Sequence, residues 1–339
     1  MPSDISVKTK ILILADDLTG ALEAGAAFAP RGIETIVTLR QLPVSKAPVL
    51  VIDTETRHVP AEEAALLVDH FLQSVPARLR YKKTDSTLRG NIRAELTALA
   101  RWGPVTYVPA YPQLGRTLRQ GCLYVDDVPI ERTVFAQDPL HPITEGNLTK
   151  LLDHCSGITL SEANTEDEIE EIARGWICTG GSAAGPSALL HAAVKLMGGK
   201  KSPPPFPAVR RALVVSASRH ENSRRQLAVA SRLFCKSGWG VLEATQEYQG
   251  DPRKFIAGFG QRAAQQLQPG SFDTLIVFGG DTACSILQAL DITTVEPLGE
   301  VVPGVPVSLL PNGLTLVTKA GGFGSPEILL QLYEKLTHV

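Results

Sequence analysis

The sequence predicts an α/β protein of two domains, each a mostly parallel sheet flanked by helices. Short apolar runs alternate with helix-like segments along most of the chain. The chain has 339 residues, a length that suits two hydrophobic cores better than one. A stretch rich in proline and glycine, 197–209, interrupts the alternation and divides it into two parts.

In the first part, the expected strands are short apolar runs that end at polar residues. They cover 11–14, 35–39, 49–52, 79–82 and 105–109, and the expected helices cover 60–75 and 92–101. Pro60 suits the first turn of a helix, and Glu62 and Glu63 favour the positive end of its dipole. This alternation predicts a mostly parallel sheet with helices on both faces.

A hairpin and a linker complete the first part. Two apolar runs, 122–125 and 128–130, flank the pair Asp126 and Asp127, which predicts a β-hairpin insertion with a polar turn. The stretch 197–209 has two glycines, two lysines and four prolines, so it cannot be a regular helix or a central strand. We therefore expect an N-terminal domain at 1–197, a linker at 198–209 and a C-terminal domain at 210–339.

Beyond the linker the alternation of strands and helices restarts. The expected strands are 212–215, 239–243 and 275–278, and the expected helices are 222–236, 253–267 and 326–336. Further β-like runs precede the last helix, so the C-terminal part of the second domain is expected to be β-rich.

Composition excludes several classes of function. Lys and Arg total 33 and Asp and Glu total 35, a balance that gives no general attraction to nucleic acid or to anionic membrane. The five cysteines are scattered without a CxxC pair, as in proteins of a reducing compartment. The N-terminal apolar run is too short for a signal peptide, and no stretch could span a bilayer. We expect a cytoplasmic protein.

Polar residues follow three of the expected strands in the first domain, where open α/β sheets bind their ligands. Asp16 and Asp17 follow the first strand, and Arg57 follows the third. The segment YKKTDSTLRGN, at 81–91, places several polar groups after the fourth. Its candidate residues are Lys83, Asp85, Ser86 and Arg89.

The chemistry of these groups suits a small polyhydroxy acid. Arg57, Arg89 and Lys83 are able to hold a carboxylate, to which Arg presents two parallel donors. The aspartates can accept hydrogen bonds from sugar hydroxyls, and one within reach of a reacting hydroxyl could take its proton. One such cluster could equally be a solvated loop with a helix cap, but three on successive strand ends favour a ligand site.

Three turns rich in glycine or serine follow strands of the second domain. They are VVSASRHENS with Ser216 and Ser218, FGGDTACS with Gly279, Gly280, Asp281 and Thr282, and KAGGFGSPE with Gly321, Gly322 and Gly324. Glycines before a helix bring backbone N–H groups to an anion, and the helix dipole adds attraction. A single turn of this kind is usually only a tight connection, whereas three in one domain favour phosphate binding. The chain has no GxxxxGK[ST], GxGxxG or GxSxG motif.

These residues resemble the four-carbon acid sugar kinase family, whose members phosphorylate tetronates such as threonate and erythronate with ATP. The similarity runs over nearly the whole chain. It covers ADDLTGA, the arginine after the third strand, KKTDSTLRGN, PAYPQLGRT, FAQDPLHP, GGSAAG, VVSAS, FGGDTA, PGVPV and KAGGFG. The KxDSTLRGN form is more similar to the threonate kinases than to the oxo-tetronate kinases. Two departures are Ala217, where the family usually has glycine, and a shorter middle region.

The resemblance implies an N-terminal domain that binds the sugar acid and a C-terminal domain that binds ATP, with Mg²⁺ as the accompanying ion. The implied sugar-acid contacts include Asp17, Arg57, Lys83, Thr84, Asp85 and Ser86. The implied ATP contacts include Ser218, Gly279, Gly280, Asp281, Thr282 and Gly322. The expected partners are a small sugar acid and ATP, without nucleic acid or membrane, in a possible homodimer.

Two aspartates compete for the role of catalytic base. Asp17 is expected to contact the substrate hydroxyl, with Asp16 supporting the loop or a metal-bound water. Asp281 is the rival, because it lies in the nucleotide turn nearest the transferred phosphoryl group. The alternatives to a kinase of four-carbon sugar acids are a kinase of another small hydroxy acid and a non-catalytic sensor of nucleotide and metabolite.

Overall fold

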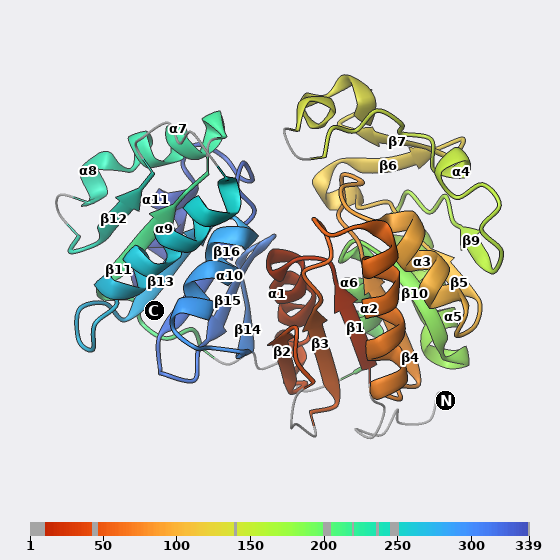
Figure 1. The fold of residues 1–339 in the computed structure, drawn as a ribbon, viewed down its shortest axis with the longest axis horizontal. Helices are drawn as coiled ribbons and strands as arrows, with labels where there is room; N and C mark the ends of the chain where they lie inside the picture. The colour runs from red at the N-terminus through yellow and green to blue at the C-terminus, as the bar shows by residue number, and fades with distance from the viewer. Residues whose placement is uncertain are drawn as a thin grey trace.

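The structure, a computed structural model, confirms an α/β protein with a large, mostly parallel sheet flanked by helices (Figure 1). It describes residues 11–42, 47–138, 141–198, 205–218, 220–234, 237–244 and 251–337. Of the predicted linker 198–209, residues 199–204 lie outside the described residues. The division into domains at 1–197 and 210–339 therefore stays a prediction.

Within its described residues, the N-terminal half contains seven parallel strands and six α-helices. In sheet order the strands are β2 (Thr35–Leu39), β3 (Val49–Asp53), β1 (Ile11–Ala15), β4 (Leu79–Lys83), β10 (Gly181–Gly185), β5 (Val105–Tyr107) and β9 (Ile158–Leu160). The helices are α1 (Leu18–Ala26), α2 (Ala61–Ser74), α3 (Ile92–Ala100), α4 (Leu148–Leu151), α5 (Glu166–Thr179) and α6 (Ala188–Leu196). Every residue of β1 is buried, because helices cover both faces of this central strand.

A small antiparallel sheet confirms the predicted hairpin insertion. It consists of β6 (Arg116–Arg119), β7 (Cys122–Val125) and β8 (Val128–Pro129). Asp126 and Asp127 form the turn between β7 and β8 with φ of 49° and 63°, as two-residue hairpin turns require. Short 3₁₀ turns occur at η1 (Ala29–Arg31), η2 (Pro112–Leu114), η3 (Ile130–Arg132) and η4 (Val134–Gln137).

In the described part of the C-terminal half, four parallel strands are followed by an antiparallel pair. In sheet order these are β12 (Gly240–Glu243), β11 (Ala212–Ser216), β13 (Thr274–Phe278), β16 (Thr315–Lys319), β15 (Val305–Leu309) and β14 (Thr294–Val302). The helices are α7 (Glu221–Val229), α8 (Ser231–Phe234), α9 (Pro252–Gln266), α10 (Gly280–Ala289) and α11 (Ile328–Thr337). The helix predicted at 222–236 is divided, because the backbone at Ala230 (φ −84°, ψ 1°) leaves the helical region.

The two halves share one sheet, whereas the sequence predicted a separate sheet in each. β14 pairs antiparallel with β2, with Thr294 opposite Thr38 and Val295 opposite Val37. Within the described residues this pairing produces a single sheet of 13 strands. α1 packs against β14, β15 and α10, so it lies at the junction of the halves (Figure 1).

Small residues allow this close packing of α1. A Cβ atom at Gly25 would lie 2.7 Å from Cγ of Pro297 in β14 and 3.0 Å from Cγ2 of Val37 in β2. One hydrophobic core cluster accordingly runs from Phe28 in the N-terminal half to Leu287 in the C-terminal half. In the described part of the chain, no helix has both the length and the apolar character needed to cross a membrane.

Candidate active site

Three predicted clusters of the N-terminal half come together at one edge of the sheet. β1 lies between β3 and β4, with Ala15 in register with both Asp53 and Lys83. Since these strands are parallel, the residues that follow them emerge side by side. Asp16, Arg57 and the segment that begins at Thr84 are therefore neighbours.

Arg57 binds the aspartates that follow β1. Its Nε and Nη2 donate to Oδ2 and Oδ1 of Asp16 over 2.8 and 3.0 Å, a bidentate pair. Its Nη1 donates to Oδ2 of Asp17 over 2.6 Å, and Nη2 lies 3.6 Å from Oδ2 of Asp85. All four side chains are buried. In this arrangement the guanidinium neutralises protein carboxylates, and its predicted contact with a sugar-acid carboxylate stays a prediction.

The two adjacent aspartates have opposite shifts in pKa. Burial opposes ionisation of Asp16, but the charges of Arg57 and Lys82 outweigh it and lower the pKa of this carboxyl. Burial and the negative charge of Asp16 raise the pKa of Asp17, in spite of the attraction of Arg57. Pairs of acids whose surroundings separate their pKa values in this way are typical of catalytic sites.

Asp17 also begins helix α1. Its Oδ1 accepts the N–H of Gly20 over 2.9 Å, so the side chain caps the helix. A Cβ at Gly20 would lie 2.8 Å from this oxygen, which explains why the residue is glycine. Gly90 has φ of +89°, and a Cβ there would lie 2.9 Å from Oδ2 of Asp16. Two glycines thus leave room for the aspartate pair.

The two consecutive lysines at the end of β4 point to opposite faces of the sheet, as strand geometry dictates. Nζ of Lys82 pairs with Oε2 of Glu95 in α3 over 3.1 Å, and both side chains are buried. Nζ of Lys83 lies 3.5 Å from Oε2 of Glu23 in α1 and donates to the carbonyl oxygen of Thr84. Lys82 therefore has a structural partner, and Lys83 faces α1.

Arg89 and Asp85 form the outer part of the cluster. Nε and Nη2 of Arg89 donate to Oδ1 and Oδ2 of Asp85 over 3.1 and 2.7 Å. Burial opposes ionisation of Asp85, but Arg89 and Arg57 hold its pKa well below the usual value. The side chain of Arg89 is 27% exposed, compared with 10% for Arg57. Ser86 is partly exposed, and Thr84 is buried.

The three turns predicted in the C-terminal half also lie together, because β11, β13 and β16 are adjacent and parallel. Ser216 ends β11, and Gly279 follows β13 with φ of +99°. The N–H of Gly279 donates to the carbonyl oxygen of Lys319 over 2.8 Å. Thr282 is buried in the first turn of α10.

Helix α7 holds the glycine-rich loop at 320–325. Oγ of Ser223 donates to the carbonyl oxygen of Gly321 over 2.6 Å and to Oγ of Ser218 over 3.0 Å. Nδ2 of Asn222 donates to the carbonyl oxygens of Gly322 and Gly324, in each case over 2.8 Å. Several loop carbonyls are therefore occupied by side chains of one helix.

Lys319 is a candidate that the sequence reasoning missed. It ends β16, is fully buried, and lies 3.9 Å from the ring centre of Phe278. Its Nζ donates to the carbonyl oxygens of Ala320 and Gly321. Burial lowers the pKa of Lys319 to about 7. The signal in the sequence was a lysine at the end of an apolar strand, two residues before a pair of glycines.

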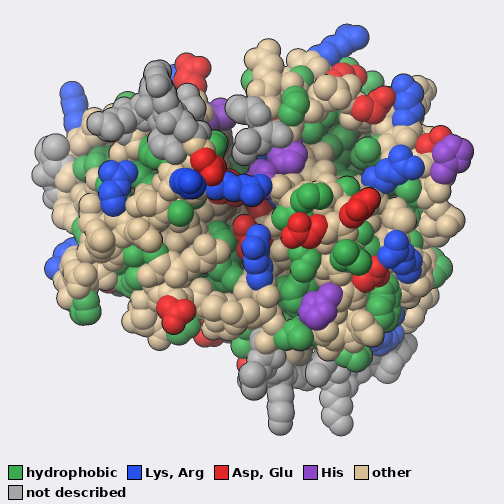
Figure 2. Space-filling view, viewed as in Figure 1, with side chains coloured by type: hydrophobic (Ala, Val, Ile, Leu, Met, Phe, Trp, Pro, Cys, Tyr) green, Lys and Arg blue, Asp and Glu red, His purple; other side chains and the backbone are tan. Residues whose placement is uncertain are grey.

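The two clusters meet where the halves meet. A Cβ at Gly280 would lie 3.1 Å from Oδ2 of Asp17 and 2.8 Å from Oγ1 of Thr19. Nε2 of His58 lies 3.6 Å from Oδ1 of Asp281, and this histidine lowers the pKa of Asp281. Figure 2 shows basic, acidic and histidine side chains gathered in the middle of the molecule, over this junction. The start of α10 thus touches the residues that follow β1.

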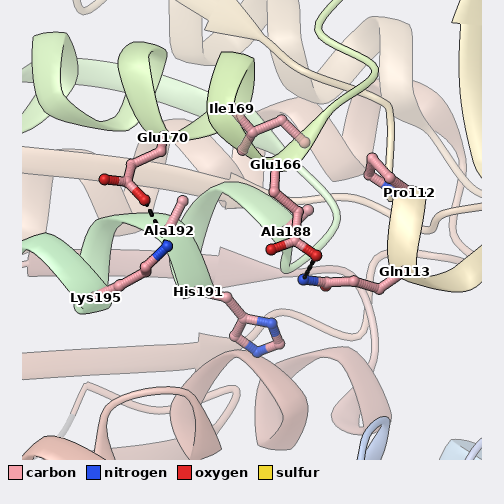
Figure 3. Close-up of a pocket in the computed structure, with 9 residues that line it drawn as sticks. All are labelled: Pro112, Gln113, Glu166, Ile169, Glu170, Ala188, His191, Ala192 and Lys195. Atoms are coloured by element: carbon pink, nitrogen blue, oxygen red, sulfur yellow. Dashed lines mark hydrogen bonds and ion pairs between the residues drawn. The ribbon is translucent and has the colours of Figure 1, made fainter.

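The small cavity shown in Figure 3 lies elsewhere and contains no predicted site residue. Its lining comes from η2, α5 and α6, including His191 and the paired side chains of Glu170 and Lys195. Its volume is about 80 Å³, whereas pockets for small-molecule ligands usually hold about 300–1,000 Å³. The cavity is smaller than that range, and it lies apart from the clusters of predicted residues.

Residues 11–230 match a family model described as a sugar-binding N-terminal domain, and residues 239–329 match one described as a nucleotide-binding C-terminal domain. The chain belongs to the four-carbon acid sugar kinase family. This finding confirms the resemblance seen in the sequence. It also accounts for the different chemistry of the two halves.

Two D-threonate kinases match this chain over most of its length, and a D-erythronate kinase matches part of it. D-threonate kinase of Cupriavidus necator is 30% identical over an alignment of 411 positions, covering 96% of this chain and 98% of the relative. D-threonate kinase of Bordetella bronchiseptica is 28% identical, covering 94% and 95%. D-erythronate kinase of Heliobacterium modesticaldum is 36% identical over 148 positions, or 40% of this chain and 34% of the relative.

A solved structure from Salmonella typhimurium LT2, described as a putative tRNA synthase, has the same fold. Its TM-score is 0.77 at 21% identity, and the match covers 96% of this chain and 99% of that one.

Proposed function

We propose that this protein transfers the terminal phosphoryl group of ATP to a hydroxyl of a four-carbon sugar acid of the threonate or erythronate type. The observation that carries the proposal is the contact between the halves. The buried aspartate cluster of the sugar-binding half directly faces the N-terminus of α10 in the nucleotide-binding half, at Asp17 and Gly280. An acceptor hydroxyl and a transferred phosphoryl group would meet at this point.

The sugar acid would bind at the carboxyl ends of β1, β3 and β4. The proposed contacts are Asp16, Asp17, Arg57, Lys83, Thr84, Asp85, Ser86 and Arg89. Arg89 is the better placed of the two arginines for the substrate carboxylate, because its side chain is the more exposed and pairs with fewer aspartates. A solved Bordetella bronchiseptica structure, 27% identical with a TM-score of 0.51, is described with bound citrate, which is also a hydroxy acid.

Asp17 is the preferred candidate for the catalytic base. Its raised pKa favours acceptance of a proton, and its Oδ2 faces the nucleotide-binding half. Asp281 has a lowered pKa, and its side chain is 51% exposed. A carboxylate that remains ionised suits Mg²⁺ better than it suits proton transfer.

ATP would bind along the turns that follow β11, β13 and β16. The proposed contacts are Ser216, Ser218, Gly279, Gly280, Asp281, Thr282, Gly321 and Gly322. Gly279 and Gly280 present backbone without side chains at the start of a ten-residue helix, an arrangement that suits phosphate. Lys319 lies directly behind the glycine-rich loop, and a bound phosphate would favour the charged form of its amine. Bound Mg²⁺ would neutralise charge on the phosphates, and Asp281 would hold it.

Two further expectations stay predictions: a cytoplasmic location and a homodimer. The Bordetella bronchiseptica structure is described as a domain-swapped dimer, which is consistent with a homodimer here.

The proposal is tested by measuring ADP release from Mg²⁺–ATP with a panel of sugar acids. The panel contains both enantiomers of threonate and erythronate, 3-oxo-tetronate, and aldonates of five and six carbons. We expect ADP release in proportion to the amount of a four-carbon acid that is supplied, and no ADP release without an acid. Release with only a longer acid would indicate a kinase of another hydroxy acid. Binding of both ligands without ADP release would indicate a sensor.

A further inference from the structure

A second group of acidic side chains lies buried between the two halves, beside the proposed transfer site. It consists of Asp53 at the end of β3, Glu55 two residues later, and Cys284 in α10. Each residue offers one potential ligand atom, and these three atoms all lie within 4.8 Å of one another. Asp53 is fully buried, Cys284 is 4% exposed, and Glu55 is partly buried.

Two of the carboxylate oxygens in this group lack hydrogen-bond donors among the described residues. Oδ1 of Asp53 accepts the N–H of Glu55 over 3.1 Å. Oδ2 of Asp53 and Oε1 of Glu55 are buried, and no donor from the described residues reaches either of them. Without a metal ion, the alternatives are a proton shared between the two carboxyl groups and a hydrogen bond from the Cys284 thiol to Glu55.

We propose that Asp53, Glu55 and Cys284 bind a divalent transition-metal ion of the Zn²⁺ type. Two carboxylate oxygens and a thiolate are ligands that Zn²⁺ takes, whereas Mg²⁺ and Ca²⁺ prefer oxygen ligands alone. The two carboxylates and the thiolate carry three negative charges. A dication together with Arg40, whose Nη2 donates to the carbonyl oxygen of Glu55 over 3.3 Å, balances them.

The surroundings leave room for a further ligand. A hollow of about 280 Å³ adjoins the group and is lined by Arg40, Glu55, Cys284, Gln288 and Asp291, among others. Water from this hollow would complete a four-coordinate site. The ion would also connect the two halves, because Asp53 and Glu55 belong to one and Cys284 to the other. Cys284 lies one helical turn beyond the start of α10, so the ion would hold that helix against β3.

The test is a Zn²⁺ titration of the full chain after chelator treatment, with binding recorded by calorimetry. Thermal unfolding is the second readout. We expect one tight site per chain and a higher Tm with Zn²⁺, but no such change with Mg²⁺. Cys284→Ser retains size and should bind Zn²⁺ at least about 10-fold more weakly, as should Asp53→Asn. Cys178→Ser is the matched control, because Cys178 is an exposed free thiol, and it should bind like the wild type.

Two results would overturn the proposal. One is the absence of a one-to-one Zn²⁺ site in the wild type. The other is unchanged affinity in Cys284→Ser, which would place any bound Zn²⁺ on other groups such as His58 and His141. Because no readout depends on phosphoryl transfer, failure here is distinguishable from failure of the proposed kinase activity.

Discussion

Arg57 donates a hydrogen bond from Nη1 to Oδ2 of Asp17 over 2.6 Å, across 40 residues of sequence. The same guanidinium binds Asp16 in a bidentate manner. Two adjacent carboxylates at the end of a buried strand are stable here because one delocalised cation neutralises both. Oδ1 of Asp17 accepts the N–H of Gly20 in α1, and Oδ2 also lies beside Gly280 of the nucleotide-binding half.

The first prediction concerns the stability that Arg57 provides. Arg57→Ala would leave Asp16, Asp17 and Asp85 buried without their common cation. Breaking a buried pair by removing one partner costs about 3–5 kcal/mol, and we expect a loss of that size in the free energy of unfolding measured with urea. Arg101→Ala is the control, because its pair with Asp69 is at the surface and is worth about 0–1 kcal/mol. Equal losses of unfolding free energy in the two variants would contradict the role of Arg57 as the common cation of the buried aspartates.

The second prediction concerns Lys319 and the nucleotide. Lys319→Met retains length but removes the ammonium that binds the carbonyls of Ala320 and Gly321. Hydrogen bonds to charged groups contribute about 1.5–3 kcal/mol, so calorimetry should show ADP binding weakened by about 10- to 100-fold. Adenosine, which lacks phosphates, should lose less. Lys335→Met, at an exposed position of α11, is the control. Equal losses for ADP and adenosine would mean that Lys319 only maintains the fold.

The third prediction is a pH dependence of stability caused by Glu300. Burial, together with the negative charge of Glu23, raises the pKa of Glu300 from 4.5 to about 8. Between these values the unfolded chain loses a proton that the folded chain retains, so the free energy of unfolding falls as pH rises. The slope is at most about 1.4 kcal/mol per pH unit, and it ends above the folded pKa.

Glu300→Gln retains an oxygen that can accept the N–H of Gly304 but does not ionise. We expect urea unfolding to show the variant gaining stability relative to the wild type from pH 4.5 to about 8. Glu296→Gln, at an exposed position of the same strand, is the control and should follow the wild type. If Glu300→Gln also follows the wild type at every pH, Glu300 ionises normally in the folded protein.

The sequence predicted the location of the site better than its internal contacts. Asp16, Arg57 and Asp85 were predicted together because the carboxyl ends of parallel strands meet at one edge, a rule that needs only strand boundaries. Which carboxylates Arg57 would bind was not predictable. Ion pairing depends on side-chain positions to within an ångström, and those positions follow from packing.

Contacts between the halves were also beyond the reach of sequence patterns. β14 joins β2 by only two residue pairs, and nothing in either strand identifies its partner. Lys319 was missed because buried lysines are rare, so a lysine after an apolar strand is normally assigned to the surface. Cys284 had no predicted role, and its proximity to Asp53 arises only where the two halves pack together.

The central claim, that Asp17 acts on the acceptor hydroxyl at the junction of the halves, is tested most directly by Asp17→Asn. Turnover should be measured at saturating Mg²⁺–ATP and sugar acid, beside Asp281→Asn. Asn can still accept the N–H of Gly20 but cannot take a proton. We predict a fall in kcat of about 10²–10⁴-fold for Asp17→Asn, with ADP affinity unchanged. Asp281→Asn should mainly raise the Mg²⁺–ATP concentration that is needed to saturate turnover. The account is contradicted if Asp281→Asn is inactive at saturating Mg²⁺–ATP while Asp17→Asn keeps its kcat and only requires a higher sugar-acid concentration.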